Sequence, residues 1–174
     1  INEDIVNIKP SQFDKNIDKN KKKLIIIGGP PCQTFSTIGH SKIESVKKKA
    51  IIEDKRNFLF RYFFNYVSYF NPEYFLIENV PNLKNKYGGL IFDEIKKLST
   101  DLGYNITYGI LNALDYGVPQ SRKRLFIFGS RSKKGFTFPE PEFGENLLIQ
   151  NNFVTVQEAI SDLPLIYDGI RANE

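Results

Sequence analysis

The hydrophobic positions of the chain predict strands and helices in alternation. Residues 24–28 and 74–77 are short, continuous apolar runs, which is typical of strands covered on both faces of a parallel sheet. Residues 5–8 form a weaker run that would suit a short strand. Residues 105–111 and 125–129 predict two more strands, and the turn residues between them suit an antiparallel pair.

Helices are expected between these strands. Residues 58–70 carry aromatic side chains all round and stop at Asn71-Pro72, which predicts a buried helix. Apolar residues recur at helical spacing over residues 90–102, and Gly103 supplies a C-cap; these are Leu90, Phe92, Ile95, Leu98 and Leu102. Residues 9–23 are a polar connection with one helical turn, and residues 41–57 are a mobile loop or a weak helix. Residues 155–163 indicate a short helix.

Composition narrows the class of protein. A chain of 174 residues with 41% hydrophobic and 14% aromatic residues is typical of one globular domain. It holds no run of about 18 apolar residues and no signal-peptide pattern, so we expect a cytoplasmic protein without a membrane segment. The single cysteine excludes an internal disulfide, and with the single His40 it is too little for a zinc site, so no metal is expected. The start at Ile1 and the lack of methionine favour a segment of a longer protein.

The charge of the chain suggests a partner without deciding it. The net charge is +4, and lysines cluster within residues 19–23 and 47–49. Such clusters bind the phosphates of nucleic acids, but they also occur in solvated loops.

Two side chains that could act in catalysis lie at the ends of two predicted strands. Cys32 follows the first strand in a loop stiffened by Pro30 and Pro31, and Glu78 follows the second. Because parallel strands bring their ends to one edge of a sheet, we expect a thiol nucleophile and a proton donor in one crevice. A lone cysteine is otherwise often a small buried hydrophobe, and a glutamate there is often a cap. Arg122 and Arg124 alternate on an extended segment, so one of them would face the crevice.

Three ordered motifs resemble those of DNA (cytosine-5) methyltransferases of the bacterial type. They are Gly-Pro-Pro-Cys-Gln-Thr-Phe-Ser at residues 29–36, Glu-Asn-Val at 78–80 and Gln-Ser-Arg-Lys-Arg at 120–124. The similarity also takes in residues 54–60, 111–119 and 155–164, and so covers nearly the whole chain. It implies a Rossmann-like, S-adenosylmethionine-dependent methyltransferase fold of the α/β class, mostly parallel with a C-terminal antiparallel hairpin and incomplete here.

The resemblance implies chemistry on a cytosine flipped out of duplex DNA, within a restriction-modification or orphan modification enzyme. The Cys32 thiolate would add to C6 and thereby activate C5 toward a methyl group, while Glu78 would donate to N3. Arg124 would hold the O2 side, supported by Arg122. The further implied contacts are Gln33, Ser36 and Asn79 with the substrate, and Asp4, Ile5, Pro31 and Leu59 with S-adenosyl-L-methionine.

The resemblance also implies an organisation for the chain. Residues 1–135 would be the central and C-terminal part of the catalytic domain, and residues 136–174 a connection toward a target-recognition region. The family's glycine-rich cofactor loop would precede Ile1, and its recognition region and closing helix would follow Glu174. The expected partners are double-stranded DNA and either the missing parts of the same enzyme or a complementary subunit.

Three alternatives remain at this point. The first is a tRNA cytosine-5 methyltransferase, which shares the Pro-Pro-Cys-Gln and Glu-Asn-Val motifs. The second is a noncatalytic relative that binds nucleic acid or a partner chain. The third is a cysteine hydrolase using His40, although no acid is evident to orient that histidine.

Overall fold

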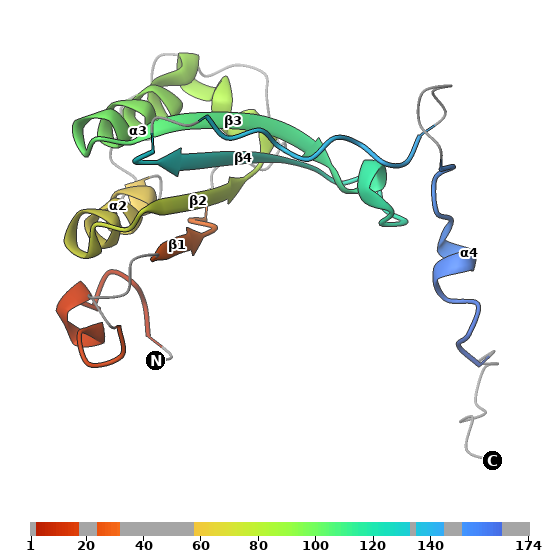
Figure 1. The fold of residues 1–174 in the computed structure, drawn as a ribbon, viewed down its shortest axis with the longest axis horizontal. Helices are drawn as coiled ribbons and strands as arrows, with labels where there is room; N and C mark the ends of the chain where they lie inside the picture. Colours follow the sequence, from red (N-terminus) through yellow and green to blue (C-terminus); the bar gives the residue numbers. More distant parts are fainter. Residues whose placement is uncertain (1–2, 18–23, 32–57, 133–134, 145–150, 165–174) are drawn as a thin grey trace, which may run out of the picture. The chain divides into compact units, whose positions relative to one another are not determined.

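A computed structural model describes residues 3–17, 24–31, 58–132, 135–144 and 151–164 (Figure 1). Several predictions therefore concern residues outside the described ranges. They include the roles of Cys32, Gln33, Ser36 and His40, the loop at 41–57, and the lysine clusters at 19–23 and 47–49.

A four-stranded mixed sheet in the order β1-β2-β4-β3 forms the centre of the described chain. Strand β1 (Ile25–Gly28) is parallel to β2 (Tyr74–Asn79), and β2 is antiparallel to β4 (Lys123–Ser130). Strand β3 (Asn105–Asn112) lies beside β4 and points the opposite way, so the predicted hairpin is present (Figure 1). The predicted α/β fold class is confirmed, with β4 as the strand that reverses direction.

Two helices cover one face of this sheet. They are α2 (Leu59–Phe70) and α3 (Leu90–Asp101). Their buried residues form one core with four sheet residues that share a face, namely Phe75, Ile77, Leu125 and Ile127. The short 3-10 helices η4 (Pro81–Lys84) and η5 (Lys86–Gly89) connect β2 to α3.

Helix α2 is less buried than its sequence predicts. Phe60, Phe63, Phe64 and Val67 are buried, whereas Tyr69 is exposed. Its aromatic residues thus lie both in the core and on the surface. The helix ends where expected, because Asn71 adopts the left-handed conformation with φ of 50°. In α3, Leu90, the first residue of the apolar spacing that predicted the helix, is exposed, and the next residue, Ile91, is buried.

The predicted strand at residues 5–8 is wrong, because this segment forms a turn. The Asp4 carboxylate accepts a hydrogen bond from the Val6 N–H at 3.0 Å, and the Asp4 carbonyl accepts one from the Asn7 N–H at 2.9 Å. Aspartate favours such turns by bonding to the backbone two residues on. The helical turn expected in the following polar segment is confirmed as the 3-10 helix η1 (Pro10–Phe13).

The chain divides into two compact units. The first contains Ile1–Ile110 and Arg124–Phe138, and the second contains Leu111–Lys123 and Pro139–Glu174. The second holds the 3-10 helix η6 (Ala113–Tyr116) and α4 (Val156–Ala159), which is shorter than the helix predicted at 155–163. The boundary at residues 135 and 136, inferred from the resemblance, stays a prediction.

Helix α4 begins with a capping box between Thr155 and Glu158. The Glu158 N–H donates to the Thr155 hydroxyl at 3.2 Å, and the Thr155 N–H donates to the Glu158 carboxylate at 2.7 Å. The hydrogen bonds from Thr155 lower the pKa of Glu158. Within the described residues, no helix is both long and apolar enough to cross a membrane.

Candidate active site at the ends of β1 and β2

The parallel pairing of β1 and β2 brings two chain segments with candidate chemistry to one edge of the sheet. Gly28 pairs with Ile77, so the segment that leaves β1 begins beside Glu78. A Cβ atom added to Gly29 would lie 3.5 Å from Oε2 of Glu78. Residues 29–31 and the Glu78 carboxylate therefore lie close together, as the rule on parallel strand ends predicts.

Glu78 and Asn79 lie within a strand and not beyond it. They pair with Phe126 and Leu125 of β4, so β2 continues two residues past the apolar run that predicted it. The added length comes from pairing with the long hairpin strand β4. Successive side chains of a strand point to opposite faces. Glu78 therefore lies on the face away from the core, and Asn79 on the core side.

Glu78 forms an ion pair with Arg124, which extends from the neighbouring strand β4. Nε of Arg124 lies 2.9 Å from Oε1 of Glu78, and the two side chains are 24% and 39% exposed respectively. The sequence predicted that one arginine of the pair Arg122 and Arg124 would face the site. An adjacent carboxylate and guanidinium can hydrogen-bond complementary polar atoms of a ligand.

Arg122 belongs to the second compact unit. Its N–H donates to Oδ1 of Asn112 at 2.9 Å, and its carbonyl accepts from the N–H of Ala113 at 3.0 Å. These bonds close the connection between β3 and β4. The supporting role predicted for Arg122 stays a prediction.

Asn79 uses both ends of its side-chain amide within the protein. Nδ2 donates to the carbonyl of Pro30 at 2.9 Å, and Oδ1 accepts from the N–H of Val80 at 2.8 Å. The residue is only 8% exposed. The substrate contact predicted for Asn79 stays a prediction, and the observed partners are backbone groups.

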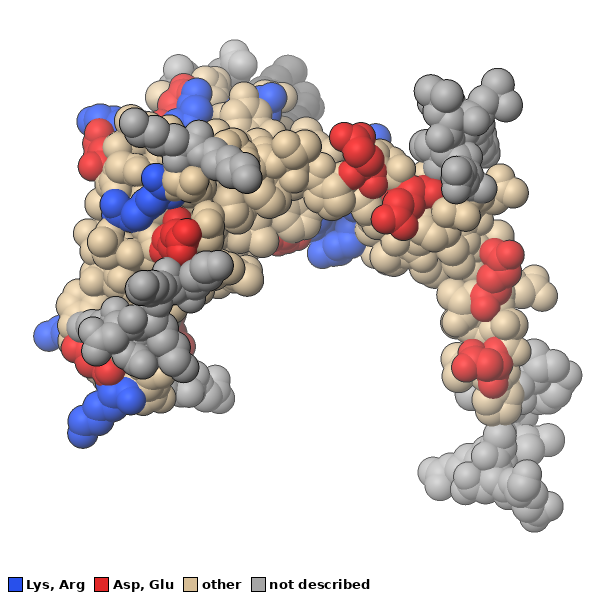
Figure 2. All heavy atoms as spheres, in the orientation of Figure 1, with Lys and Arg blue, Asp and Glu red and all other residues tan. Residues whose placement is uncertain are grey.

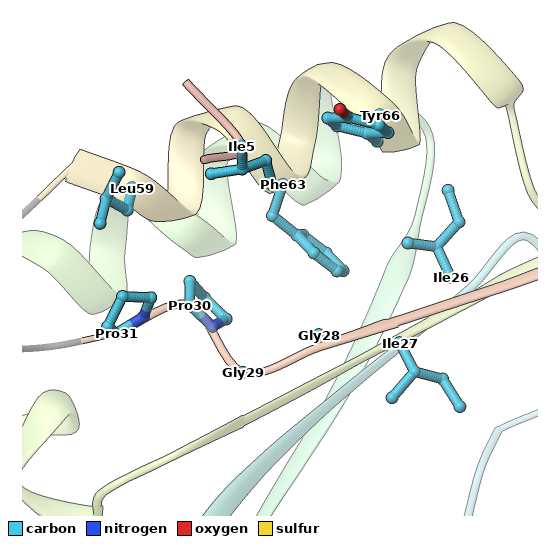
Figure 3. A pocket seen from close by; sticks show the side chains of 10 residues that line it. All are labelled: Ile5, Ile26, Ile27, Gly28, Gly29, Pro30, Pro31, Leu59, Phe63 and Tyr66. Atoms are coloured by element: carbon cyan, nitrogen blue, oxygen red, sulfur yellow. The ribbon is translucent and has the colours of Figure 1, made fainter. Parts of the chain in front are cut away.

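An apolar pocket of about 290 Å³ lies between β1 and α2 (Figure 3). Its walls are residues 26–31, three residues of α2 and Ile5 from the N-terminal segment. The residues of α2 are Leu59, Phe63 and Tyr66. The ring of Phe63 packs so closely on Gly28 that a Cβ there would lie 2.8 Å from it.

Three of the four residues predicted to contact a cofactor line this pocket. They are Ile5, Pro31 and Leu59. The fourth, Asp4, is not among the lining residues, and its carboxylate accepts from the Val6 N–H. Phe63 and Tyr66 were not predicted as pocket residues, although the spacing 59, 63, 66 places them with Leu59 on one face of a helix.

Tyr66 joins this pocket to the N-terminal segment. Its hydroxyl donates to the carbonyl of Ile8 at 3.1 Å, and its ring meets Phe13 edge to face at 6.0 Å. One helix turn further, the Tyr69 hydroxyl donates to Asp14 at 2.8 Å. Helix α2 therefore anchors the segment that brings Ile5 to the pocket.

The described part of the second unit is acidic. It carries Asp115, Glu140, Glu142, Glu158 and Asp162 against two basic residues, Arg122 and Lys123. Figure 2 shows red acidic side chains along the residues of this unit. Nothing in its described residues forms a basic patch. Among all the described residues, no group of three or more His, Cys, Asp or Glu side chains could hold a metal ion.

Comparison with known proteins gives a consistent match along the chain. The family model for C-5 cytosine-specific DNA methylase matches residues 1–167. The chain is 36% identical over 150 residues to the type II methyltransferase M.Bpa9945I of Bacillus paralicheniformis, covering 82% of this chain and 32% of that protein. It is also 36% identical over 172 residues to the type II methyltransferase M.DdeI of Desulfomicrobium norvegicum, covering 97% and 38%.

Solved structures give the same match. A candidate DNA modification methyltransferase encoded within an E. coli prophage superposes with a TM-score of 0.65 at 30% identity, covering 97% of this chain and 43% of that one. The Dnmt2 methyltransferase of S. pombe superposes with a TM-score of 0.54 at 28% identity, covering 77% and 37%. The chain thus spans less than half the length of these relatives.

Proposed function

We propose that this chain, which belongs to the C-5 cytosine-specific DNA methylase family, carries the catalytic centre of an enzyme that methylates cytosine at C5 in duplex DNA. The observation that carries the proposal is the shared edge of β1 and β2. There the segment leading to Cys32, the Glu78 carboxylate and the Arg124 guanidinium come from three separate motifs of the family. The similarity to type II methyltransferases supports a role in restriction-modification.

The described pocket fits the apolar parts of S-adenosylmethionine. Its lining is aliphatic and aromatic, which suits an adenine ring and the carbon chain beside a sulfonium. Among the lining side chains only Tyr66 has a polar atom, and its hydroxyl donates to the carbonyl of Ile8. When bound, S-adenosylmethionine supplies the methyl group. Ile5, Pro31, Leu59 and Phe63 would hold it by packing.

Three side chains of the protein would each act on a different position of the cytosine ring. The Cys32 thiolate would add to C6, which places negative charge on the ring and makes C5 nucleophilic. Glu78 would donate to N3 and so offset that charge, while Arg124 would bind on the O2 side. After methylation, a base removes the proton from C5 and the thiolate leaves. The base must be flipped out of the duplex for these groups to reach it.

Transfer to tRNA is the second candidate, because the tRNA branch shares the two motifs around Cys32 and Glu78. The type II methyltransferases among its relatives favour DNA. Both candidates use the same residues, so the polymer must be tested directly.

The full-length protein should form a covalent adduct with duplex DNA that contains 5-fluorocytosine and a target site. Fluorine at C5 cannot leave as a proton does, so the bond between sulfur and C6 persists. Denaturing electrophoresis and peptide mapping would locate the adduct, which we expect at Cys32. An adduct formed only with 5-fluorocytosine tRNA would replace DNA by tRNA in the proposal. An adduct with neither polymer would contradict the methyltransferase function.

Glu78→Gln should lower the rate of methyl transfer by about 10²-fold or more, because a neutral amide cannot supply the proton to N3. The matched control is Glu94→Gln, since Glu94 on α3 also pairs with an arginine, Arg61, at 2.5 Å. Neither Glu94 nor Arg61 lines the pocket or belongs to the three motifs, so loss of that pair should leave the rate nearly unchanged. Single-turnover methylation of duplex DNA measures both variants. Equal rates for the two would remove Glu78 from the chemistry.

A further inference from the structure

Asn79 connects the end of β2 to the chain that leaves β1. Its neighbours on the core side, Ile77 and Leu125, are fully buried, and Asn79 itself is 8% exposed. From this position its amide donates to the carbonyl of Pro30 and accepts from the N–H of Val80. The amide thus spans two segments that are 49 residues apart in sequence.

The connection lies where backbone pairing is no longer available. The register between β1 and β2 ends at Gly28 opposite Ile77, and two prolines follow at positions 30 and 31. Proline has no N–H, so neither residue can donate a hydrogen bond to a neighbouring strand. A side-chain donor from β2 can still reach the Pro30 carbonyl, and Asn79 supplies it.

We propose that Asn79 is a positioning residue, which fixes the segment 29–31 relative to Glu78; the inference rests on the proposed function. Glu78 is the residue before Asn79 and points to the opposite face. The end of β2 therefore carries both the proposed acid, Glu78, and Asn79, whose hydrogen bond to Pro30 we call the tether. Cys32 follows Pro31 in the sequence. The tether therefore sets where the chain that bears the nucleophile begins, and Asn79 acts through the backbone without touching the base.

The variant Asn79→Asp removes the hydrogen bond to Pro30 and keeps the hydrogen bond to Val80. It has nearly the same shape and keeps an oxygen for the Val80 N–H, but it places an oxygen where Nδ2 donates to Pro30. In the full-length protein, we expect the single-turnover rate at saturating DNA and S-adenosylmethionine to fall about 10²-fold. The KM for DNA should stay unchanged, because no contact with DNA is removed.

The control is Asn151→Asp. The Asn151 amide also donates to a backbone carbonyl, that of Glu142 at 3.1 Å, but it lies in the second unit and is exposed. This variant should keep the unsubstituted rate. If Asn79→Asp does not fold, Asn79→Ser gives the test, because it lacks the amide donor and introduces no charge.

Two results would overturn the inference. One is a single-turnover rate for the folded Asn79 variant equal to that of Asn151→Asp, even with lowered thermal stability, since the role would then be only structural. The other is a raised KM for DNA at an unchanged rate, which indicates a direct substrate contact. Absence of methyl transfer by the unsubstituted protein would overturn the proposed function itself, and the inference with it.

Discussion

Cys32→Ser should abolish methyl transfer by the full-length protein, with a loss of at least about 10⁴-fold. A serine hydroxyl is far less acidic than a thiol and is scarcely ionised at neutral pH, so it cannot add to C6 of the ring. The same variant should form no adduct with 5-fluorocytosine DNA. Incorporation of labelled methyl groups and denaturing electrophoresis measure the two effects.

The control for this variant is His40→Ala, which removes the histidine of the hydrolase alternative and leaves the thiol. It should retain adduct formation. Binding of duplex DNA by Cys32→Ser should also persist, because contacts with the phosphates supply much of the affinity for DNA and the substitution removes no basic residue. Retained methyl transfer by Cys32→Ser would assign the nucleophile to another residue and favour a noncatalytic role for the motif.

Gly129→Ala should destabilise the protein by about 3 kcal/mol or more. Gly129 of β4 pairs with Phe75 of β2, and a Cβ there would come closer to the Phe75 ring than the 3.0 Å that real Cβ atoms respect. The ring cannot move aside, because it is fully buried and meets Phe63, Phe64 and Tyr104 edge to face. Urea unfolding of the full-length protein measures the loss.

Gly135→Ala is the matched control for this substitution. A Cβ at Gly135 has no atom within 4 Å, so the same change of residue should leave the free energy of unfolding nearly unaltered. Equal stabilities for the two variants would show that the core beside β4 can accommodate an extra methyl group. The close packing of the sheet on α2 would then not exclude residues larger than glycine at position 129.

The sequence predicted the sheet and the meeting of Glu78 with the segment after β1, because both depend on strand order. Apolar runs identify parallel strands, and parallel strands bring their ends together whatever the side chains are. It was wrong for residues 5–8, where a weak apolar run suggested a strand, because the Asp4 carboxylate accepts a hydrogen bond from the Val6 N–H and the segment forms a turn. A local hydrogen bond of this kind leaves little trace in a hydrophobic pattern.

The pocket was harder to predict than the ion pair. The aromatic residues of α2 cover a wide face opposite Arg61, Asn65 and Ser68, so the pattern alone did not separate those that face the core from those that line a cavity. Phe63 does both, since it belongs to the core and lines the pocket. The tether from Asn79 was also missed, because a motif shows which residues occur together but not whether each contacts a ligand or the backbone.

The hydrogen bond from Tyr66 to Ile8 couples the binding of a ligand in the pocket to the docking of the N-terminal segment. The residue lines the pocket and donates to Ile8, while Ile5 of the same segment forms another part of the wall. Any ligand that contacts both walls gains affinity from the docked segment. By linkage, the ligand then stabilises docking of residues 3–17 by the same free energy, so filling the pocket and ordering the segment are cooperative.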